Sequence, residues 1–551
     1  MSNVLRYWWL VAITGSLFMA QPAIAAEGVE GKKSNLVSVQ WLEQNLKRND
    51  VLLLDASPGQ LYAAKHIPGA VNVDVFSFGG RESSAAEMQQ RIQSWGVSKG
   101  KKIVLYDQGG TYMATSLFFD LYYHGFPADA MFVLDGGMAK WQATGGAVTK
   151  DPTPAPKPGT FRVAKLKHDV RVRLPEFLVA SGDPVNNALV EALDPDQHFG
   201  GAKFFDRAGH IPNAIMAPSA DFFNADKTFK SAEEIRRMLT YLGVKPEQQI
   251  YTHCGGGIAA SVPFFAAKMM LNYPKVKLYK ESQLEWLRDD RGLPFWTFDA
   301  PNLVREKSWL NGWGNPMLRS FGVAKLNVVD VRPAEAYNLG HVPYAVNIPA
   351  DVFKRHLATP AKLAEVLSAA GVDPAHEAVI VSDGGLNANS ALAFLMLEKL
   401  GQKKVSVLME GVDDWGLGGF TLTKEATTVG LKKSPKDIAI PATTYVVNVR
   451  PGIVTSELQS AQGPYPKIYI ASGKNVPDKT LDGKVIHVPY ADLLNADKTL
   501  KPAKDIWTIL VKAGLPRYAE IICVADDPGE AAANYFILKS MGFPDVKVLV
   551  S

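Results

Sequence analysis

The chain repeats one ordered set of motifs three times, and a weaker fourth copy lies near its end. Each copy begins with an apolar run that contains an acid, namely VLLLDAS, ALVEALD and LNVVDVR. A histidine before Ile-Pro or Val-Pro follows, at His66, His210 and His341. About 40 residues further on, a second apolar run ends in a Gly-rich loop, and a third run leads to a tryptophan. Such self-similarity indicates a chain built from several copies of one folding unit.

The apolar runs predict buried parallel strands. They are nearly continuous in Val, Ile and Leu, as in sheets that are covered on both faces. Helical stretches such as SAEEIRRMLTYLG and SALAFLMLEKLG alternate with them, and both end in glycine. This alternation predicts an α/β fold: four tandem domains arranged as two pairs, each with a mostly parallel sheet flanked by helices. Ligands of such sheets bind at the carboxyl ends of the strands, where the Gly-rich loops lie.

Linkers divide the chain into its expected domains. The Pro-rich stretch 149–160 is expected to be an extended, semi-rigid spacer. In the weak fourth copy, YVVNVRP is expected as the first strand, IYIASGKNVPDK replaces the histidine motif, and EIICVADDPGEAAAN supplies strand, loop and helix start. The domains expected from these boundaries are residues 34–150, 162–300, 303–425 and 437–551.

The first 25 residues are interpreted as a secretory signal peptide. Arg6 precedes an apolar stretch, and the segment closes on Ala23-Ile24-Ala25, a small-x-small cleavage pattern. An uncleaved anchor helix is the alternative, but the stretch is shorter than the ~20 residues that span a bilayer. A cleaved chain would be periplasmic or secreted and would have no membrane anchor. The net charge of +4, without a long basic run, argues against a nucleic-acid partner.

Only two cysteines are present, Cys254 and Cys523, so no disulfide framework is expected. Cys523 lies within EIICVADD and is interpreted as a small core residue. Cys254 instead opens the loop THCGGGIAAS, where a strand is expected to end and a helix to begin. Main-chain N–H groups and the helix dipole at such a turn favour a thiolate, which is the nucleophilic form of cysteine. The three glycines let the backbone adopt unusual dihedrals and approach a ligand closely.

This ordered set of motifs resembles the rhodanese family of sulfurtransferases over nearly the whole predicted mature chain. Tandem members pair an inactive domain, with Asp at the first loop position, with an active domain that has Cys there. By this resemblance Asp107 marks an inactive first domain, Cys254 the active second, Asp383 an inactive third and Asp526 a degenerate fourth.

The resemblance implies an exported sulfurtransferase that moves sulfane sulfur from a small donor to a thiophilic acceptor through a persulfide on Cys254. The main chain of the loop would bind the substrate through Gly255, Gly256, Gly257, Ile258 and Ala259. No cofactor and no metal are implied, and the third and fourth domains offer surface for a protein partner. The alternative is a non-catalytic rhodanese-like platform that binds sulfur or docks proteins.

The donor stays open between thiosulfate, polysulfide and a mercapto acid. The loop resembles the Cys-Gly-x-Gly type of 3-mercaptopyruvate sulfurtransferases, whereas thiosulfate-specific members carry a basic residue there. Yet the stretch where mercaptopyruvate enzymes place arginines has Asp196 and His198, and only Lys203 and Arg207 bring positive charge. A phosphatase is disfavoured because the loop is short and has no arginine.

The remaining recurrent residues are interpreted as structural. His66, His210 and His341 each precede the proline of a turn, where a histidine can bond the backbone, and they are not expected to bind metal. His253 is expected to be a packed histidine. The recurrent tryptophans, expected in the core, are Trp141, Trp286 and Trp415.

Overall fold

The computed structural model describes residues 34–550, apart from residues 79–82, 432–437, 456–462 and 479. The predicted signal peptide, residues 1–25, lies outside the described residues. Among the helices of residues 34–550 that are described, none is both long enough and apolar enough to span a bilayer.

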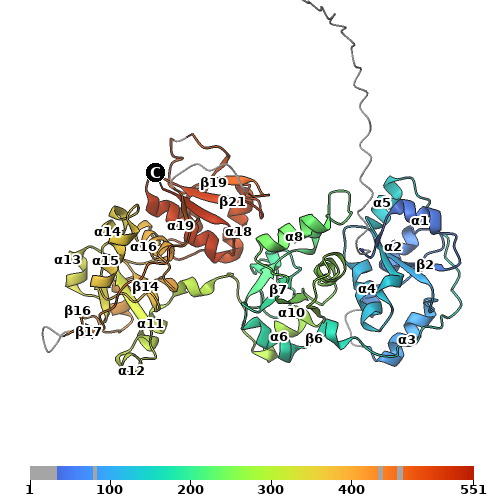
Figure 1. The fold of residues 1–551 in the computed structure, drawn as a ribbon, viewed down its shortest axis with the longest axis horizontal. Helices are drawn as coiled ribbons and strands as arrows, with labels where there is room; N and C mark the ends of the chain where they lie inside the picture. Colours follow the sequence, from blue (N-terminus) through green and yellow to red (C-terminus); the bar gives the residue numbers. More distant parts are fainter. Residues whose placement is uncertain (1–33, 79–82, 432–437, 456–462, 479, 551) are drawn as a thin grey trace, which may run out of the picture. The chain divides into compact units, whose positions relative to one another are not determined.

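Four five-stranded sheets share one strand order in the described part of the chain. Figure 1 shows strands as arrows with helices beside them. In the first sheet the order is β1-β5-β4-β2-β3, and neighbouring strands run parallel. The first sheet consists of β1 (Leu36–Val37), β2 (Val51–Asp55), β3 (Val71–Asn72), β4 (Lys102–Tyr106) and β5 (Met131–Leu134). The second consists of β6 (Arg171–Val172), β7 (Asn187–Glu191), β8 (Ala214–Met216), β9 (Gln249–His253) and β10 (Val276–Tyr279).

The third and fourth sheets repeat this arrangement. The third consists of β11 (Val304–Arg305), β12 (Leu326–Asp330), β13 (Ala345–Asn347), β14 (Glu377–Val381) and β15 (Lys404–Leu408). The fourth consists of β18 (Val454–Thr455), β19 (Lys467–Ala471), β20 (Lys484–His487), β21 (Glu520–Val524) and β22 (Val546–Leu549). We refer to the segments that carry these sheets as repeats 1 to 4. The predicted α/β class with parallel sheets is confirmed, while the domain boundaries stay a prediction.

Helices flank each sheet. Those of repeat 1 are α1 (Val39–Asn45), α2 (Gly59–Ala64), α3 (Ala85–Ser94), α4 (Met113–Tyr123) and α5 (Gly137–Ala143). Those of repeat 2 are α6 (Leu174–Ser181), α7 (Pro195–His198), α8 (Ala232–Tyr241), α9 (Ser261–Phe265) and α10 (Ser282–Trp286). Those of repeat 3 are α11 (Lys307–Trp313), α12 (Pro316–Ser320), α13 (Ala334–Leu339), α14 (Ala350–Arg355), α15 (Pro360–Ala369), α16 (Ala388–Lys399) and α17 (Val412–Leu417). Those of repeat 4 are α18 (Ala503–Lys512) and α19 (Pro528–Ser540).

Strand β2 shows why its sequence is a continuous apolar run. Leu52 and Leu54 point into one hydrophobic cluster, and Leu53 between them points into another. Successive side chains of a strand face opposite sides of the sheet, so both faces of this sheet are covered. A strand with two covered faces has no position left for an alternating polar residue.

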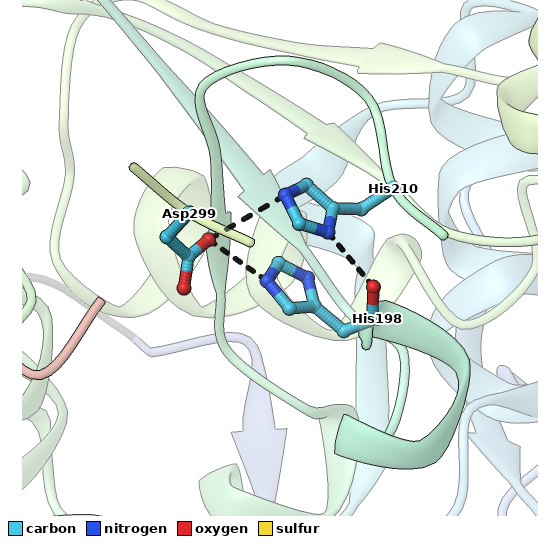
Figure 2. A group of neighbouring side chains, drawn as sticks. All are labelled: His198, His210 and Asp299. Carbon is cyan, nitrogen blue, oxygen red and sulfur yellow. Dashed lines mark hydrogen bonds and ion pairs between the residues drawn. The ribbon is translucent and has the colours of Figure 1, made fainter. Parts of the chain in front are cut away.

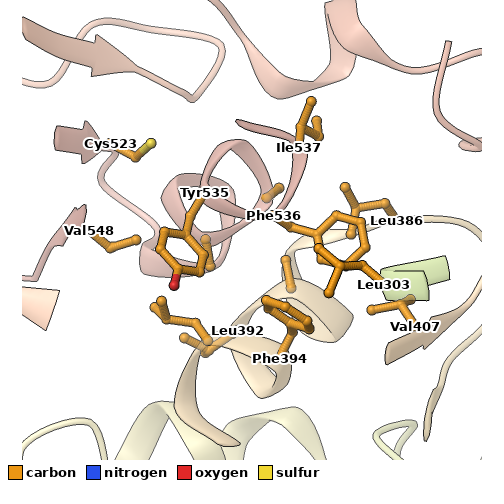
Figure 3. Packing of buried hydrophobic residues seen from close by; sticks show 14 of the residues in the cluster. Leu303, Leu386, Leu392, Phe394, Val407, Cys523, Tyr535, Phe536, Ile537 and Val548 are labelled. Carbon is orange, nitrogen blue, oxygen red and sulfur yellow. The ribbon is translucent and has the colours of Figure 1, made fainter. Parts of the chain in front are cut away.

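The repeats share their larger cores in pairs. Phe118 and Phe119 of α4 meet Phe265 and Phe264 of α9 edge-on, with ring centroids 5.1 and 5.0 Å apart, within one cluster that joins repeats 1 and 2. Helices α16 and α19 meet in the cluster of repeats 3 and 4, where the ring centroids of Phe394 and Phe536 lie 4.9 Å apart (Figure 3). The pairing therefore rests on aromatic contacts between equivalent helices.

Repeat 4 departs from the sequence-based prediction. The segment YVVNVRP is not a strand: it runs along the end of α16, where the Asn448 and Arg450 amides donate to the carbonyls of Leu400 and Lys399. One of the two strands that pair with β21 is β19, Lys467–Ala471, which overlaps the start of IYIASGKNVPDK. An additional pair of short parallel strands, β16 (Thr427–Val429) and β17 (Ile438–Ile440), lies before repeat 4.

The histidine turns and the tryptophans are structural, as predicted. His66 and His341 stack on Tyr62 and Tyr337, and each Nδ1 bonds to the carbonyl of the tyrosine beneath it, at 2.9 and 3.0 Å. The backbone of each histidine also pairs with a segment after the last helix of its repeat. The three recurrent tryptophans are buried, and each indole N–H donates to a carbonyl within eight residues: Trp141, Trp286 and Trp415.

Candidate active site

Cys254 directly follows β9 and stands ahead of α9, at the carboxyl end of a central strand. The Gly257 amide donates to Cys254 Sγ at 3.1 Å, and the Cys254 amide donates to Ser282 Oγ at 3.1 Å. Within the described part of the chain, the backbone amides of Gly255, Gly256 and Ile258 donate to no acceptor. The sulfur therefore lies beside a main-chain cradle with unused donors.

The three glycines of the loop have different roles. Only Gly257 has a positive φ, +76°, and a Cβ there would lie 2.0 Å from the Lys280 carbonyl oxygen. Gly255 would meet the Phe205 ring at 3.4 Å, and Gly256 faces open space. The expectation that all three supply unusual dihedrals is therefore wrong for Gly255 and Gly256, because the strained turn is confined to one residue.

Strand register identifies the positions that correspond to Cys254 in the other repeats. The last residues of β9, β4, β14 and β21 occupy the same place in their sheets, each opposite the end of the neighbouring strand. The residues that follow them are Cys254, Asp107, Ser382 and Ala525.

This register corrects two assignments. Asp383 and Asp526 were expected to correspond to Cys254, but each lies one position further along the loop and is exposed, whereas Ser382 and Ala525 are buried. The physical reason is that β14 and β21 each end one residue earlier than the Gly-rich motif implied. Asp107 alone is an aspartate at the corresponding position.

The equivalent loops hold no nucleophilic thiol. The Asp107 carboxylate accepts from the amides of Gly109 and Ala114 at 2.8 and 2.9 Å, so it occupies the cradle of its own loop as an internal anion. Ser382 Oγ accepts from the Gly384 amide at 3.4 Å, and Ala525 has no polar side-chain atom. Of the four equivalent positions, only the one in repeat 2 has a sulfur atom.

An open pocket of about 420 Å³ lies over Cys254. Repeat 1 contributes Phe76 and Tyr112, and burial followed by the charge of nearby Cys254 raises the pKa of Tyr112. The other lining residues belong to repeat 2: Ala192, Leu193, Asp194, Gln197, Phe204, Phe205, Ser219, Cys254, Gly255, Gly256, Ile258 and Ala259. Sequence reasoning missed the walls from Phe76, Tyr112 and the 192–205 segment, because they come from other loops and another repeat.

A buried ion pair and a hydroxyl pair fix repeat 1 against the site. Lys280 Nζ bonds to both carboxylate oxygens of Asp120, at 3.0 and 3.4 Å, and each side chain is only 10% exposed. Thr115 Oγ1 and Ser261 Oγ lie 2.8 Å apart at the starts of α4 and α9. Since the Lys280 carbonyl faces Gly257, the ion pair also holds the segment against which the loop packs.

The two cations that the sequence offered as anion-binding candidates do not line the pocket. Arg207 donates to the carbonyls of Trp286, Arg288 and Leu293, at 2.7, 3.1 and 2.5 Å, so its guanidinium holds the end of repeat 2 together. Lys203 is exposed and is not among the lining residues. The lining residues include one carboxylic acid, Asp194, and no lysine, arginine or histidine.

A buried polar cluster lies behind the loop, and Figure 2 shows three of its members. His198 Nδ1 contacts Glu191 Oε2, and its Nε2 lies 2.9 Å from Asp299 Oδ1. His210 stacks on His198, with ring centroids 3.7 Å apart, and its Nε2 lies 3.6 Å from the same Asp299 oxygen. Gln283 joins this cluster to the loop, since its side-chain Nε2 donates to Glu191 Oε1 and its backbone amide donates to the Cys254 carbonyl at 3.1 Å.

The charge state of His198 holds the cluster together: when the ring is protonated, its two N–H groups face Glu191 and Asp299. Burial alone would lower the pKa of His198, but the charges of Asp299 and Glu191 outweigh it and raise the pKa to about 9. Burial would raise the pKa of Glu191, but His198 holds it at about 2. Burial, with His198⁺ beside it, lowers the pKa of His210 to about 4. The donor atoms of His198, His210 and Asp299 lie within 4.8 Å of one another, but the in-plane lone pairs of two parallel rings do not converge on one ion.

His253 packs as predicted. Its side chain is fully buried against Phe177, with ring centroids 5.4 Å apart, and burial lowers its pKa to about 4. It is therefore neutral near pH 7, and neither of its ring nitrogens has a hydrogen-bond partner in the described part of the chain. Cys523 is also buried, and both cysteines are free.

Comparisons with known proteins agree with this fold. A family model described as the rhodanese-like domain matches residues 38–144, 178–289 and 317–417. These segments belong to repeats 1, 2 and 3 and together cover more than half of the chain. Repeat 4 has the same strand order as the matched repeats.

Curated relatives match about half of this chain and nearly the whole of their own length. The sulfur carrier protein TtuD of Thermus thermophilus is 30% identical over 270 residues, 46% of this chain and 93% of the relative. The 3-mercaptopyruvate sulfurtransferase of Escherichia coli is 27% identical over 272 residues, 45% of this chain and 94% of the relative. Among solved structures, SseA from Escherichia coli is 24% identical over 45% of this chain and 99% of that chain, with a TM-score of 0.40.

Proposed function

Since the chain belongs to the rhodanese family, we propose that it is a sulfurtransferase that carries a sulfane sulfur atom as a persulfide on Cys254. Its curated relatives support sulfur transfer in general. The observation that supports the proposal most directly is the placement of Cys254 Sγ, which borders an open pocket and accepts from the Gly257 amide. The corresponding residues Asp107, Ser382 and Ala525 have no thiol that could carry the transferred sulfur.

The proposed reaction has two displacement steps. The Cys254 thiolate attacks the outer sulfur of a donor such as thiosulfate, the donor S–S bond breaks, and sulfite leaves with the bonding electron pair. Cys254–S–S⁻ remains, and its terminal sulfur is close to the unused amides of Gly255, Gly256 and Ile258. A thiophilic acceptor then attacks that sulfur and restores the thiolate, so the kinetics are ping-pong.

The roles of the repeats follow from their contacts. Repeat 1 supplies Phe76 and Tyr112 to the pocket wall and the Asp120 partner of Lys280, so it is proposed to complete the active site without reacting itself. Repeats 3 and 4 are proposed to provide additional surface for a protein partner, with repeat 4 a diverged copy of the same domain.

The test measures transfer to cyanide as acceptor. Thiocyanate is followed with thiosulfate, inorganic polysulfide, 3-mercaptopyruvate and an aromatic thiosulfonate as donors, for the wild type and for Cys254→Ser. We expect a Cys254-dependent rate with at least one donor, and intact mass spectrometry is expected to show one added sulfur atom on the wild type alone. Equal rates in both proteins with every donor, and no added mass, would favour the alternative function as a non-catalytic docking platform.

Export is a separate proposal. The N-terminal segment supports a cleaved signal peptide over residues 1–25 and a periplasmic or secreted mature chain. Sequencing the N-terminus of the protein isolated from its native cells tests this directly. A mature chain that starts immediately after Ala25 supports export, and an intact Met1 in a cytoplasmic fraction contradicts it.

A further inference from the structure

We propose that the Cys254 pocket selects a sulfur donor whose sulfane sulfur is attached to an apolar, aromatic group and that carries less negative charge than thiosulfate. This inference rests on the proposed sulfurtransferase function and adds an aromatic donor class to those that the sequence left open. It is drawn from the charge of the pocket wall and from the side chains at its mouth.

Electrostatics of the described wall disfavour a small dianion. No lysine, arginine or histidine is among the described residues that line the pocket, and Asp194 is the one carboxylic acid among them. Arg207 is held by four carbonyls, and Lys280 is paired with Asp120. A dianion such as thiosulfate would lose hydration on entering without gaining a side-chain counterion, which is costly.

The side chains at the mouth of the pocket, in contrast, favour an apolar donor. Phe76 is 53% exposed and Phe204 is 69% exposed, although both are large aromatic side chains. They line the pocket together with Phe205, Leu193 and Ile258. Exposed aromatic rings grouped at one concave site are characteristic of ligand binding, and about 420 Å³ is enough for a compound with one ring.

Benzenethiosulfonate is a suitable probe of this class. The Cys254 thiolate attacks its terminal sulfur, the bond between that sulfur and the sulfonyl sulfur breaks, and benzenesulfinate leaves with the electron pair. The products are Cys254–S–S⁻ and one sulfinate anion, so two negative charges enter the step and two leave it. Methanethiosulfonate reacts through the same bond with the same charge and lacks only the ring.

The experiment compares kcat/KM for benzenethiosulfonate, methanethiosulfonate and thiosulfate, with cyanide as acceptor. Each value is divided by the rate constant of that donor with a free small thiol, which removes differences in intrinsic reactivity. We expect benzenethiosulfonate to exceed thiosulfate by at least about tenfold after this correction, with methanethiosulfonate between them.

Two variants separate the ring from the charge. Phe204→Ala is expected to lower kcat/KM for benzenethiosulfonate about fivefold and to change the thiosulfate value less than about twofold. Phe321→Ala is the matched control, because Phe321 is 71% exposed in repeat 3 and does not line the pocket. Asp194→Asn keeps a helix-capping residue and is expected to raise the thiosulfate value about two- to threefold more than the benzenethiosulfonate value.

The outcomes distinguish this inference from the proposed function. If Cys254→Ser abolishes loading but thiosulfate is the best corrected donor, the pocket selectivity is wrong and the sulfurtransferase function stands. An unchanged donor ratio in Phe204→Ala and Asp194→Asn also contradicts the selectivity. If no donor adds sulfur to Cys254, the proposed function fails and the selectivity fails with it.

Discussion

Replacing Gly257 with alanine tests whether the turn beside Cys254 controls the chemistry. Gly257 has a φ of +76°, a conformation that costs an L-residue about 1–2 kcal/mol. The new Cβ would lie 2.0 Å from the Lys280 carbonyl oxygen, where a separation of at least 3.0 Å is normal. Lys280 cannot easily retreat because its side chain is fixed by Asp120.

The loop must therefore move by about 1 Å, the difference between these two separations. Such a shift carries the Gly257 amide away from Cys254 Sγ, to which it donates at 3.1 Å. A misplacement of about 1 Å in an active site can cost about 100-fold in rate. We expect Gly257→Ala to lose between about 10- and 100-fold in persulfide loading and about 1–2 kcal/mol or more in the free energy of unfolding.

The assay follows the added sulfur on Cys254 by intact mass against time, and urea unfolding gives the stability. Gly312→Ala is the matched control, since a Cβ at Gly312 would meet no atom within 4 Å and Gly312 lies outside the pocket. This variant should add sulfur to Cys254 within about twofold of the wild-type rate, because one methyl group in open space costs little. If Gly257→Ala gains sulfur as fast as Gly312→Ala while its far-ultraviolet spectrum is native, the role given to this turn is refuted.

Three further predictions concern stability and reactivity. Breaking the buried ion pair by Asp120→Ala should cost about 3–5 kcal/mol in urea unfolding. Asp226→Ala breaks a more exposed pair, with 33% and 48% side-chain exposure, and should cost clearly less; equal costs would contradict the buried role of the first pair. The folded pKa of His198 is raised to about 9 from 6.5, so its stabilisation is complete below pH 6.5 and is lost as the pH rises through 9. His198→Gln should therefore flatten the decline in the urea midpoint over that range, and an unchanged slope would sink the assignment. Burial strongly raises the pKa of Cys523, so iodoacetamide should label the native wild type once, at Cys254, and leave Cys254→Ser unlabelled; labelling of Cys523 in the native protein would show that it is accessible.

Local patterns predicted the sheets and the reactive loop because they depend on local chemistry. The run KIVLY became β4 and QIYTH became β9, since nearly continuous apolar runs suit strands buried on both faces. The Ser and Glu of SAEEIRRMLTYLG form a capping box at the start of α8, which fixes where that helix begins. The histidine turns were also predictable, because the histidine, the proline and the preceding aromatic residue are close in sequence.

Local patterns did not predict the residues at which β14 and β21 end, because hydrogen bonds between strands determine those ends. The motifs SDGG and VADD placed an aspartate at the expected loop opening, but hydrogen bonds to β12 and β19 end the strands at Val381 and Val524. The corresponding residues are therefore Ser382 and Ala525. The pocket wall was equally invisible in the sequence, since Tyr112 of repeat 1 meets Cys254 only after two repeats have packed together.

The shared core of repeats 1 and 2 has a consequence during synthesis. Thr115 and Ser261, which meet where α4 contacts α9, are separated by 146 positions in the chain. At about 5–20 residues per second, a ribosome needs roughly 7–30 s to add the second partner after the first. For that interval the aromatic face of α4 has no partner in the nascent polypeptide, so this face offers contact area to a holding chaperone.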